Sequence, residues 1–139
     1  MTRKTTTGAV LESMIIPALV RGGYEFKTQE NVGIRAGGGK HMVDVVAEKG
    51  NKRFLISLKW QQTSGTAEQK VPFEVICLVE AIIDGRNKYQ KAYLVLGGEG
   101  WKLREFYTSG GLKKHLEYAE KVDIVTLEKF VALANQGEL

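Results

Sequence analysis

The chain has 139 residues, of which 43% are hydrophobic and 26% charged, a composition that excludes a disordered or fibrous protein. Its net charge of +4 is compatible with an anionic partner such as nucleic acid but does not require one. The single cysteine, Cys77, excludes a disulfide framework and a zinc site with several thiolates, and no apolar run could span a bilayer. We expect one soluble, cytoplasmic domain over residues 1–139, with residues 1–7 as a flexible polar arm.

Hydrophobic spacing and turn residues predict the secondary structure. The predicted elements, in chain order, are a helix over 8–21, strands over 24–32, 42–47 and 54–60, a buried helix over 73–83, a strand over 92–96, short helices over 101–107 and 112–119, a strand over 122–125 and a helix over 127–135. Pro17 should kink the first helix, and Pro72 should place the start of the buried helix near Val71. This order predicts an α/β fold with a central mixed sheet flanked by helices.

A glycine-rich segment, residues 33–40, separates the first two strands. It is no P-loop, because His41 follows Lys40 where that motif needs Ser or Thr. The segment could be a flexible connector or a loop that approaches a phosphate backbone closely. His41 itself is expected to be an ordinary, partly exposed residue that could contact phosphate.

Charged residues end two otherwise apolar strands. Asp44 lies on the second strand and Lys59 on the third, and Gly50-Asn51 predicts a tight hairpin between them. Alternation along the third strand places Leu55, Ser57 and Lys59 on one face. Asp44 should therefore converge with Ser57 and Lys59, and burial of such charges is costly unless they are paired or bind a metal.

These residues resemble the motif of the PD-(D/E)XK nuclease superfamily. Val43-Asp44 stands at the place of the Pro-Asp pair, Leu58-Lys59 supplies the X-K, and the following K-W-Q-Q-T-S-G-T-A-E-Q-K-V-P-F-E is similar to the segment after X-K in some members. The resemblance implies a restriction-endonuclease-like α-β-β-β-α-β core, reproduced here from about Gly8 to Leu96. It also implies a metal-dependent DNA endonuclease of restriction, homing or phage type that uses Mg²⁺, or Mn²⁺ as a substitute.

Site roles follow from the same resemblance. Asp44 and the backbone carbonyl of Leu58 would bind the metal, and Lys59 would orient the attacking water or stabilise the phosphorus centre. Gln61 matches a polar residue beside the active site, and Glu12 matches a helical glutamate that contacts the metal in some members. Glu12 is equally readable as a surface residue.

Ser57 departs from the family pattern, which has Asp or Glu at that position. A serine hydroxyl is a poor Mg²⁺ ligand. One explanation is that the acid has moved to the following helix, as in some members with S-X-K, with Glu74 as the first candidate and Glu68 as the second. Alternatively, the serine disables the enzyme, or the fold is kept for binding alone.

DNA contacts and assembly are the remaining expectations. The candidate phosphate contacts are Arg35, Lys40, His41, Lys70, Lys113 and Lys114, several of which could instead form a solubilising surface. A homodimer is expected, because small nucleases of this class usually pair two active sites to cut both strands. The alternatives are a resolvase for Holliday junctions or branched DNA, a catalytically inactive DNA-binding protein and, less favoured, a protein-interaction domain.

Overall fold

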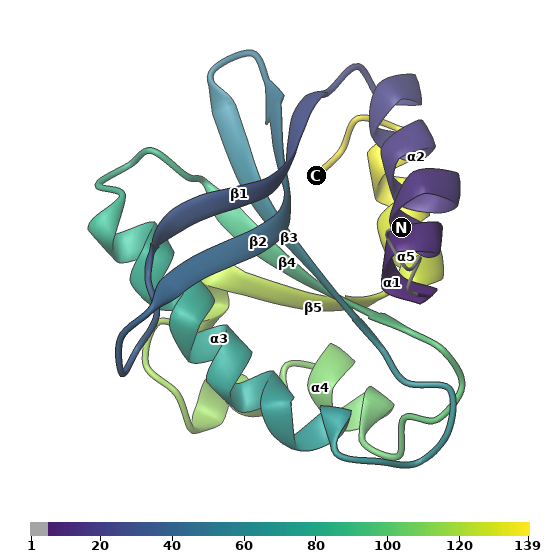
Figure 1. Ribbon diagram of the computed structural model, residues 1–139, viewed down its shortest axis with the longest axis vertical. Helices are drawn as coiled ribbons and strands as arrows, with labels where there is room; N and C mark the ends of the chain where they lie inside the picture. The colour runs from purple at the N-terminus through teal and green to yellow at the C-terminus, as the bar shows by residue number, and fades with distance from the viewer. Residues whose placement is uncertain (1–5) are drawn as a thin grey trace, which may run out of the picture.

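A five-stranded sheet with helices on both faces forms the protein (Figure 1), as the computed structural model describes it over residues 6–139. The strands are β1 (Glu25–Ile34), β2 (Lys40–Lys49), β3 (Lys52–Trp60), β4 (Lys91–Gly97) and β5 (Val122–Thr126). The helices are α1 (Thr6–Val10), α2 (Ile16–Arg21), α3 (Ala67–Asp84), α4 (Arg104–Thr108) and α5 (Leu127–Asn135). A π-helical turn covers Leu11–Ile15, and short 3₁₀ helices cover Gly111–Lys114 and Ala119–Lys121.

The strands lie side by side in chain order, β1-β2-β3-β4-β5. The first three form an antiparallel meander, whereas β3, β4 and β5 run parallel. Parallel neighbours need a crossover connection, and α3 provides it between β3 and β4. The predicted mixed sheet and its α-β-β-β-α-β order are confirmed.

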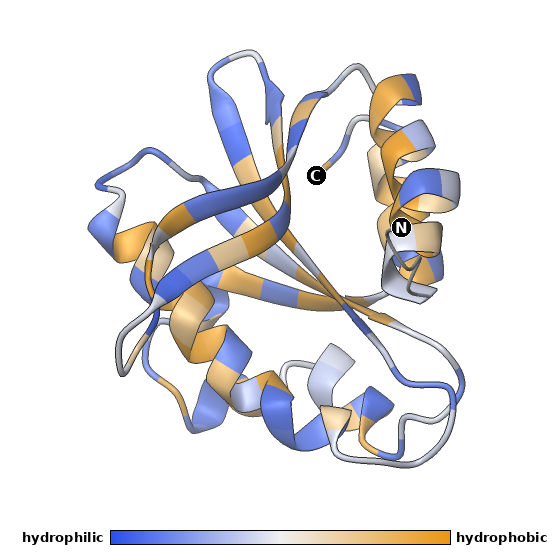
Figure 2. Ribbon diagram, viewed as in Figure 1, coloured by the Kyte–Doolittle hydropathy of each residue, from blue (hydrophilic) through white to orange (hydrophobic). Residues whose placement is uncertain are grey.

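Two hydrophobic cores fill the spaces between the sheet and its two helical layers. One core joins α1, α2 and α5 to Phe54, Ile56 and Leu58 of β3. The other joins α3 and the α4 region to Leu55 of the same strand. Apolar residues accordingly follow the inward faces of the helices and the central strands (Figure 2). The side chain alternation predicted for β3 is confirmed, and it directs Ser57 towards the α3 layer.

Pro17 perturbs the first helix as expected, and the chain accommodates it with a wider turn. Proline has no N–H, so it leaves the carbonyl of Ser13 without its usual helical donor. The preceding segment is π-helical, and the N–H of Ile16 bonds the carbonyl of Leu11, five residues back. Thr6 and Thr7 already belong to α1, so the expected flexible arm is wrong for these two; its first five residues lie outside the described part.

Helix α3 begins four residues earlier than Pro72 suggested. The proline lies inside the helix and leaves the carbonyl of Glu68 without its usual donor. The hydroxyl of Tyr107 donates to that carbonyl at 2.6 Å, so the buried acceptor is satisfied from α4. A neighbouring element thus compensates the proline. None of the helices within residues 6–139 combines the length and apolarity that crossing a membrane requires.

Candidate functional site

Asp44 lies where β2 and β3 separate. Their paired residues extend only as far as Val45 and Ile56. Beyond that point the Asp44 carboxylate replaces the neighbouring backbone, because its Oδ2 accepts a hydrogen bond from the N–H of Leu58 at 2.7 Å. The end of the ladder therefore presents a half-buried carboxylate beside the segment that carries Ser57 and Lys59.

Ser57 and Glu74 meet between the sheet and α3. Both are buried, at 4% and 5% exposure, and the Ser57 hydroxyl donates to Oε2 of Glu74 at 3.1 Å. Ser57 occupies the strand position where the motif calls for an acid, and the helix supplies a carboxylate directly against it. The geometry thus brings together Asp44, Ser57 and Glu74, the first of the two predicted helix glutamates.

The charges of this group are coupled. Burial raises the pKa of Asp44 above its ordinary value; the bond from Leu58 and the positive charge of Lys59 oppose this rise, whereas the negative charge of Glu74 adds to it. Burial also favours a higher pKa for Glu74, but His41, Lys59 and the Ser57 hydroxyl outweigh it and lower that pKa. Lys59 therefore interacts with both carboxylates, and at neutral pH Glu74 is held as an anion.

His41 is not the partly exposed residue that the sequence suggested. Only 1% of it is accessible, so it has no surface to offer a phosphate group. Its Nε2 lies 3.6 Å from Oε2 of Glu74, which is longer than a normal hydrogen bond, and neither ring nitrogen bonds to any other group within residues 6–139. A buried polar atom without a partner costs about 1–3 kcal/mol.

Gln29 also belongs to this neighbourhood, although no motif in the sequence points to it. It lies opposite Asp44, because its flanking residues in β1 pair with those flanking Asp44 in β2. Its φ of 51° is unusual for a residue within a strand, and its side chain amide bonds to Asp44 and lowers the pKa of that carboxyl. Only the strand register reveals this contact, since no local motif marks the residue.

Gln61 and Glu68 form a separate buried cluster at the start of α3. The Gln61 side chain accepts from the N–H of Ala67 and donates to the carbonyl of Gly100 and to Glu68. The same Glu68 oxygen, Oε1, accepts from the N–H of Lys102. These bonds cap α3 and fasten the segment after β4. Glu68 also lies six residues before Glu74, about 9 Å along the helix axis, so the geometry favours Glu74 as the second carboxylate.

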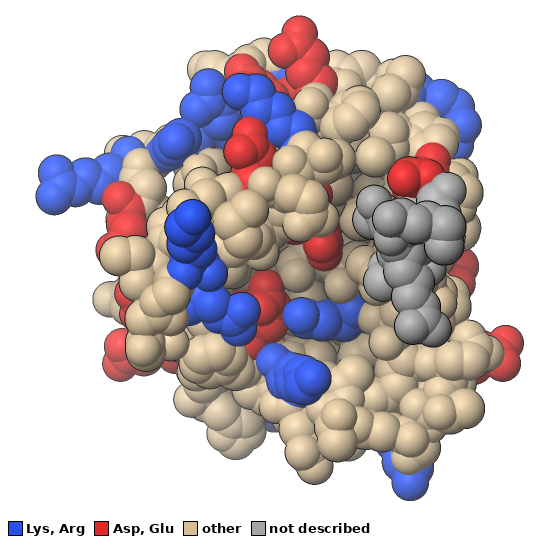
Figure 3. Space-filling view, in the orientation of Figure 1, with Lys and Arg blue, Asp and Glu red and all other residues tan. Residues whose placement is uncertain are grey.

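The other predicted residues are spread over the surface. The guanidinium of Arg35 lies 5.4 Å from the ring centre of Phe73, next to Glu74 on α3, while Lys40 and Lys70 are exposed. Basic side chains gather around acidic ones near the middle of one face of the molecule (Figure 3). Glu12 is exposed on the π-helical turn, in the helical layer that packs against the opposite face of the sheet from α3.

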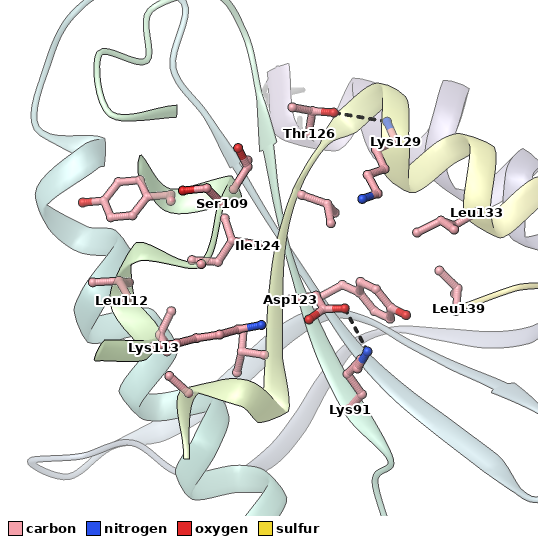
Figure 4. Close-up of a pocket in the computed structure, with 18 of the residues that line it drawn as sticks. Lys91, Ser109, Leu112, Lys113, Asp123, Ile124, Thr126, Lys129, Leu133 and Leu139 are labelled. Carbon is pink, nitrogen blue, oxygen red and sulfur yellow. Dashed lines mark hydrogen bonds and ion pairs between the residues drawn. The ribbon is translucent and has the colours of Figure 1, made fainter. Parts of the chain in front are cut away.

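A cavity of about 640 Å³ lies away from Asp44, beside the edge strand β5 (Figure 4). Lys113 lines it together with Lys91 and Asp123, which form an ion pair at 2.8 Å. Lys91 and Tyr93 of β4 line this cavity, and β3 lies between β4 and β2 in the sheet. The structure therefore does not bring Lys113, or its neighbour Lys114, to the group around Asp44.

The donor set around Asp44 suits a hard divalent cation. The N–H of Leu58 engages Oδ2 of Asp44, and the Ser57 hydroxyl engages Oε2 of Glu74. The Gln29 amide also bonds the Asp44 carboxylate. Mg²⁺ is usually held by one or two carboxylates, with waters and substrate phosphates completing its octahedral shell. Residues 6–139 contain no group of three or more His, Cys, Asp or Glu side chains arranged around a metal position. Two carboxylates are the type of donor that a hard divalent cation takes, with waters completing its shell.

Comparison with known proteins gives the following similarities. No curated protein matches the chain. Among solved structures, a protein of unknown function shares 14% identity over 81% of this chain and 54% of its own, with a TM-score of 0.49. The small subunit of the heterodimeric restriction endonuclease R.BspD6I shares 21% identity over 86% of this chain and 64% of its own, with a TM-score of 0.42. The chain thus spans less than two thirds of either structure.

The match to a family model extends over nearly the whole chain. The model describes a PD-(D/E)XK nuclease superfamily domain and covers residues 3–138. That range includes the whole of the described sheet, with Asp44, Ser57, Lys59 and Glu74. The chain therefore belongs to the PD-(D/E)XK nuclease superfamily.

Proposed function

We propose that this protein is a Mg²⁺-dependent DNA endonuclease whose second acidic residue is on helix α3 instead of strand β3. The hydrogen bond between Ser57 and Glu74, 3.1 Å long and buried, is the observation that carries the proposal. It pairs the serine at the usual acid position with a carboxylate that is held as an anion. The bond favours a relocated acid over a serine that simply removes one.

Each residue has a separate task in this proposal. Asp44 and Glu74 hold the cation, with the backbone carbonyl of Leu58 as a further ligand. When bound, the cation would lower the pKa of a water molecule that it coordinates and would stabilise negative charge on the phosphate. Lys59 orients the attacking water or stabilises charge on the phosphate oxygens. Gln61 acts indirectly by fixing the start of α3, the helix that carries Glu74.

DNA would approach over the surface formed by the β1–β2 loop and α3. Arg35 contacts Phe73 on α3, and Lys70 precedes Glu74 by four residues, which places it on the same helix face. Lys40 is exposed at the start of β2. These three side chains are the proposed phosphate contacts, so binding should weaken as salt is added.

Cleavage of supercoiled plasmid DNA with Mg²⁺ or Mn²⁺ tests the proposal. Asp44→Asn, Lys59→Met and Glu74→Gln should each lower the cleavage rate by roughly 100-fold or more. Glu80→Gln is the matched control, because Glu80 is exposed on the same helix, and it should cleave like the wild type. Cleavage that survives both Asp44→Asn and Lys59→Met would refute the assignment. Salt-sensitive DNA binding without cleavage under any divalent ion would favour a binding protein on the nuclease fold.

A homodimer and double-strand cutting complete the proposal. Two copies would place one active site against each strand, and light scattering after size-exclusion chromatography would give the mass of the assembly. A four-way junction assayed beside linear duplex distinguishes a resolvase from a restriction-type enzyme. Preferential junction cleavage would replace the restriction-type assignment.

A further inference from the structure

His41 is a buried histidine without a conventional hydrogen-bond partner. It lies on β2, three residues before Asp44, with 1% of its surface accessible. Neither Nδ1 nor Nε2 forms a hydrogen bond within the described residues. Burial excludes direct contact with DNA, so any role for the imidazole must act through the residues packed around it.

The polar neighbour of the ring is Glu74. Nε2 of His41 lies 3.6 Å from Oε2 of Glu74, and the Ser57 hydroxyl donates to that same oxygen at 3.1 Å. Two groups from two different strands therefore flank one carboxylate oxygen. The other oxygen, Oε1, has no hydrogen bond to residues 6–139.

We propose that His41 is a positioning residue for Glu74: with Ser57 it holds Oε2 and leaves Oε1 as the oxygen that binds the cation. The inference rests on the proposed function, because it assigns a purpose to the orientation of the metal-binding glutamate. A small tightening of the packing would turn the 3.6 Å contact into a charge-assisted hydrogen bond. Partners that orient a metal-binding side chain in this way commonly change metal affinity by roughly 10- to 100-fold when removed.

Mn²⁺ affinity of the apoprotein, measured from the free-ion signal in electron paramagnetic resonance, tests this role without an activity assay. His41→Met fills the space but removes the donor, so Mn²⁺ binding should weaken by roughly 10- to 100-fold. His41→Gln keeps an amide donor near the position of Nε2 and should restore most of the affinity. His115→Met is the matched control at an exposed histidine and should bind Mn²⁺ like the wild type.

A double-mutant cycle separates positioning from general destabilisation. In a Glu74→Gln background, His41→Met should have no further effect on Mn²⁺ affinity, because the carboxylate that it positions is already absent. A full additional loss in that background would overturn the proposal. So would a His41→Met protein that melts at a lower temperature yet binds Mn²⁺ with wild-type affinity.

Nuclear magnetic resonance of the wild-type imidazole provides a test that does not depend on the folding of any His41 variant. The ¹⁵N spectrum should show a proton on Nε2, and Glu74→Gln should shift that resonance. A proton carried only on Nδ1, or an Nε2 resonance indifferent to Glu74, would overturn the proposal. If the wild-type protein bound no Mn²⁺, the proposed function would fail, and the resonance would still decide whether His41 holds Glu74.

Discussion

Replacement of Ser57 by glutamate would give this chain the acid that the family motif calls for, and we expect the change to be harmful. Ser57 is 4% exposed, and its hydroxyl touches Glu74 at 3.1 Å. A second carboxylate at this position would lie beside Glu74 and near Asp44. It would also remove the donor that now satisfies Oε2.

The magnitude follows from the separation of the charges. Two carboxylates about 4 Å apart repel by about 4 kcal/mol at an effective dielectric constant near 20. Side chain movement and partial protonation reduce this figure, so we expect Ser57→Glu to lower the free energy of unfolding by about 2–4 kcal/mol at neutral pH. The plasmid cleavage rate should fall as well.

The double variant Ser57→Glu/Glu74→Gln moves the acid from the helix to the strand. It removes the repulsion, so urea denaturation should show recovery of about 2 kcal/mol or more relative to Ser57→Glu. Cleavage should exceed that of Glu74→Gln alone. If Ser57→Glu were as stable as the wild type and cleaved DNA much faster, the serine would be a disabling substitution and the relocated acid would be refuted.

Three further predictions concern the surroundings of the site. Burial raises the pKa of Asp44 in the folded protein above its ordinary value of 3.8. At a pH above this raised pKa, the ionised carboxylate lowers the stability of the fold, and at a pH below 3.8 this destabilisation disappears. Asp44→Asn should therefore be the more stable protein at about pH 8, with a gap in melting temperature that narrows towards about pH 3. In Gly98→Ala the new methyl group would overlap the Gln61 carbonyl, whereas in Gly110→Ala, also at positive φ, it would meet only a side chain at 3.4 Å. Urea denaturation should therefore show that Gly98→Ala lowers the free energy of unfolding by about 2 kcal/mol more than Gly110→Ala does. Gln61→Ala should cost about 2–4 kcal/mol and expose the start of α3, near Ala67, to faster amide exchange.

A smaller cost for Gly98→Ala than for Gly110→Ala would show that the segment after β4 can move away from Gln61. Unchanged exchange in Gln61→Ala would show that α3 is held without its side chain cap. If the difference in melting temperature between Asp44→Asn and the wild type did not change with pH, burial would not destabilise the ionised carboxylate of Asp44. Each result would contradict one specific contact described above.

The features that could be predicted from the sequence are those governed by local periodicity. Alternation along β3 assigns Ser57 and Lys59 to one face because successive strand side chains point to opposite faces. The Gly50-Asn51 turn sets β2 against β3, since two residues suffice to reverse an antiparallel pair. Glu74 could be nominated because the motif was one acid short and the next helix carried glutamates near its start, Glu68 and Glu74.

Tertiary contacts decided what the sequence could not indicate. The alternating pattern of β2 does place His41 on a buried face. A histidine beside a glycine-rich loop is nevertheless expected to be exposed, and only the packing of α3 against the sheet shows that it is buried. Pro72 suggested a later helix start, because a proline inside a helix leaves one carbonyl without a donor. The donor to that carbonyl, which belongs to Glu68, is Tyr107, 35 positions after the proline, and no local pattern reveals this contact. The contact of Gln29 with Asp44 depends on the register between two strands. The roles of the site residues stay predictions.

The proposed division of the acid pair between β2 and α3 would make the chemistry depend on tertiary packing. Two acids on adjacent strands would be kept in place by the backbone ladder, which persists until the sheet itself melts. Glu74 depends instead on the apolar contacts of Val71, Val75 and Leu78 beneath α3. On warming, the proposed cleavage activity should therefore be lost while the sheet is still intact, because α3 can undock before the strands separate.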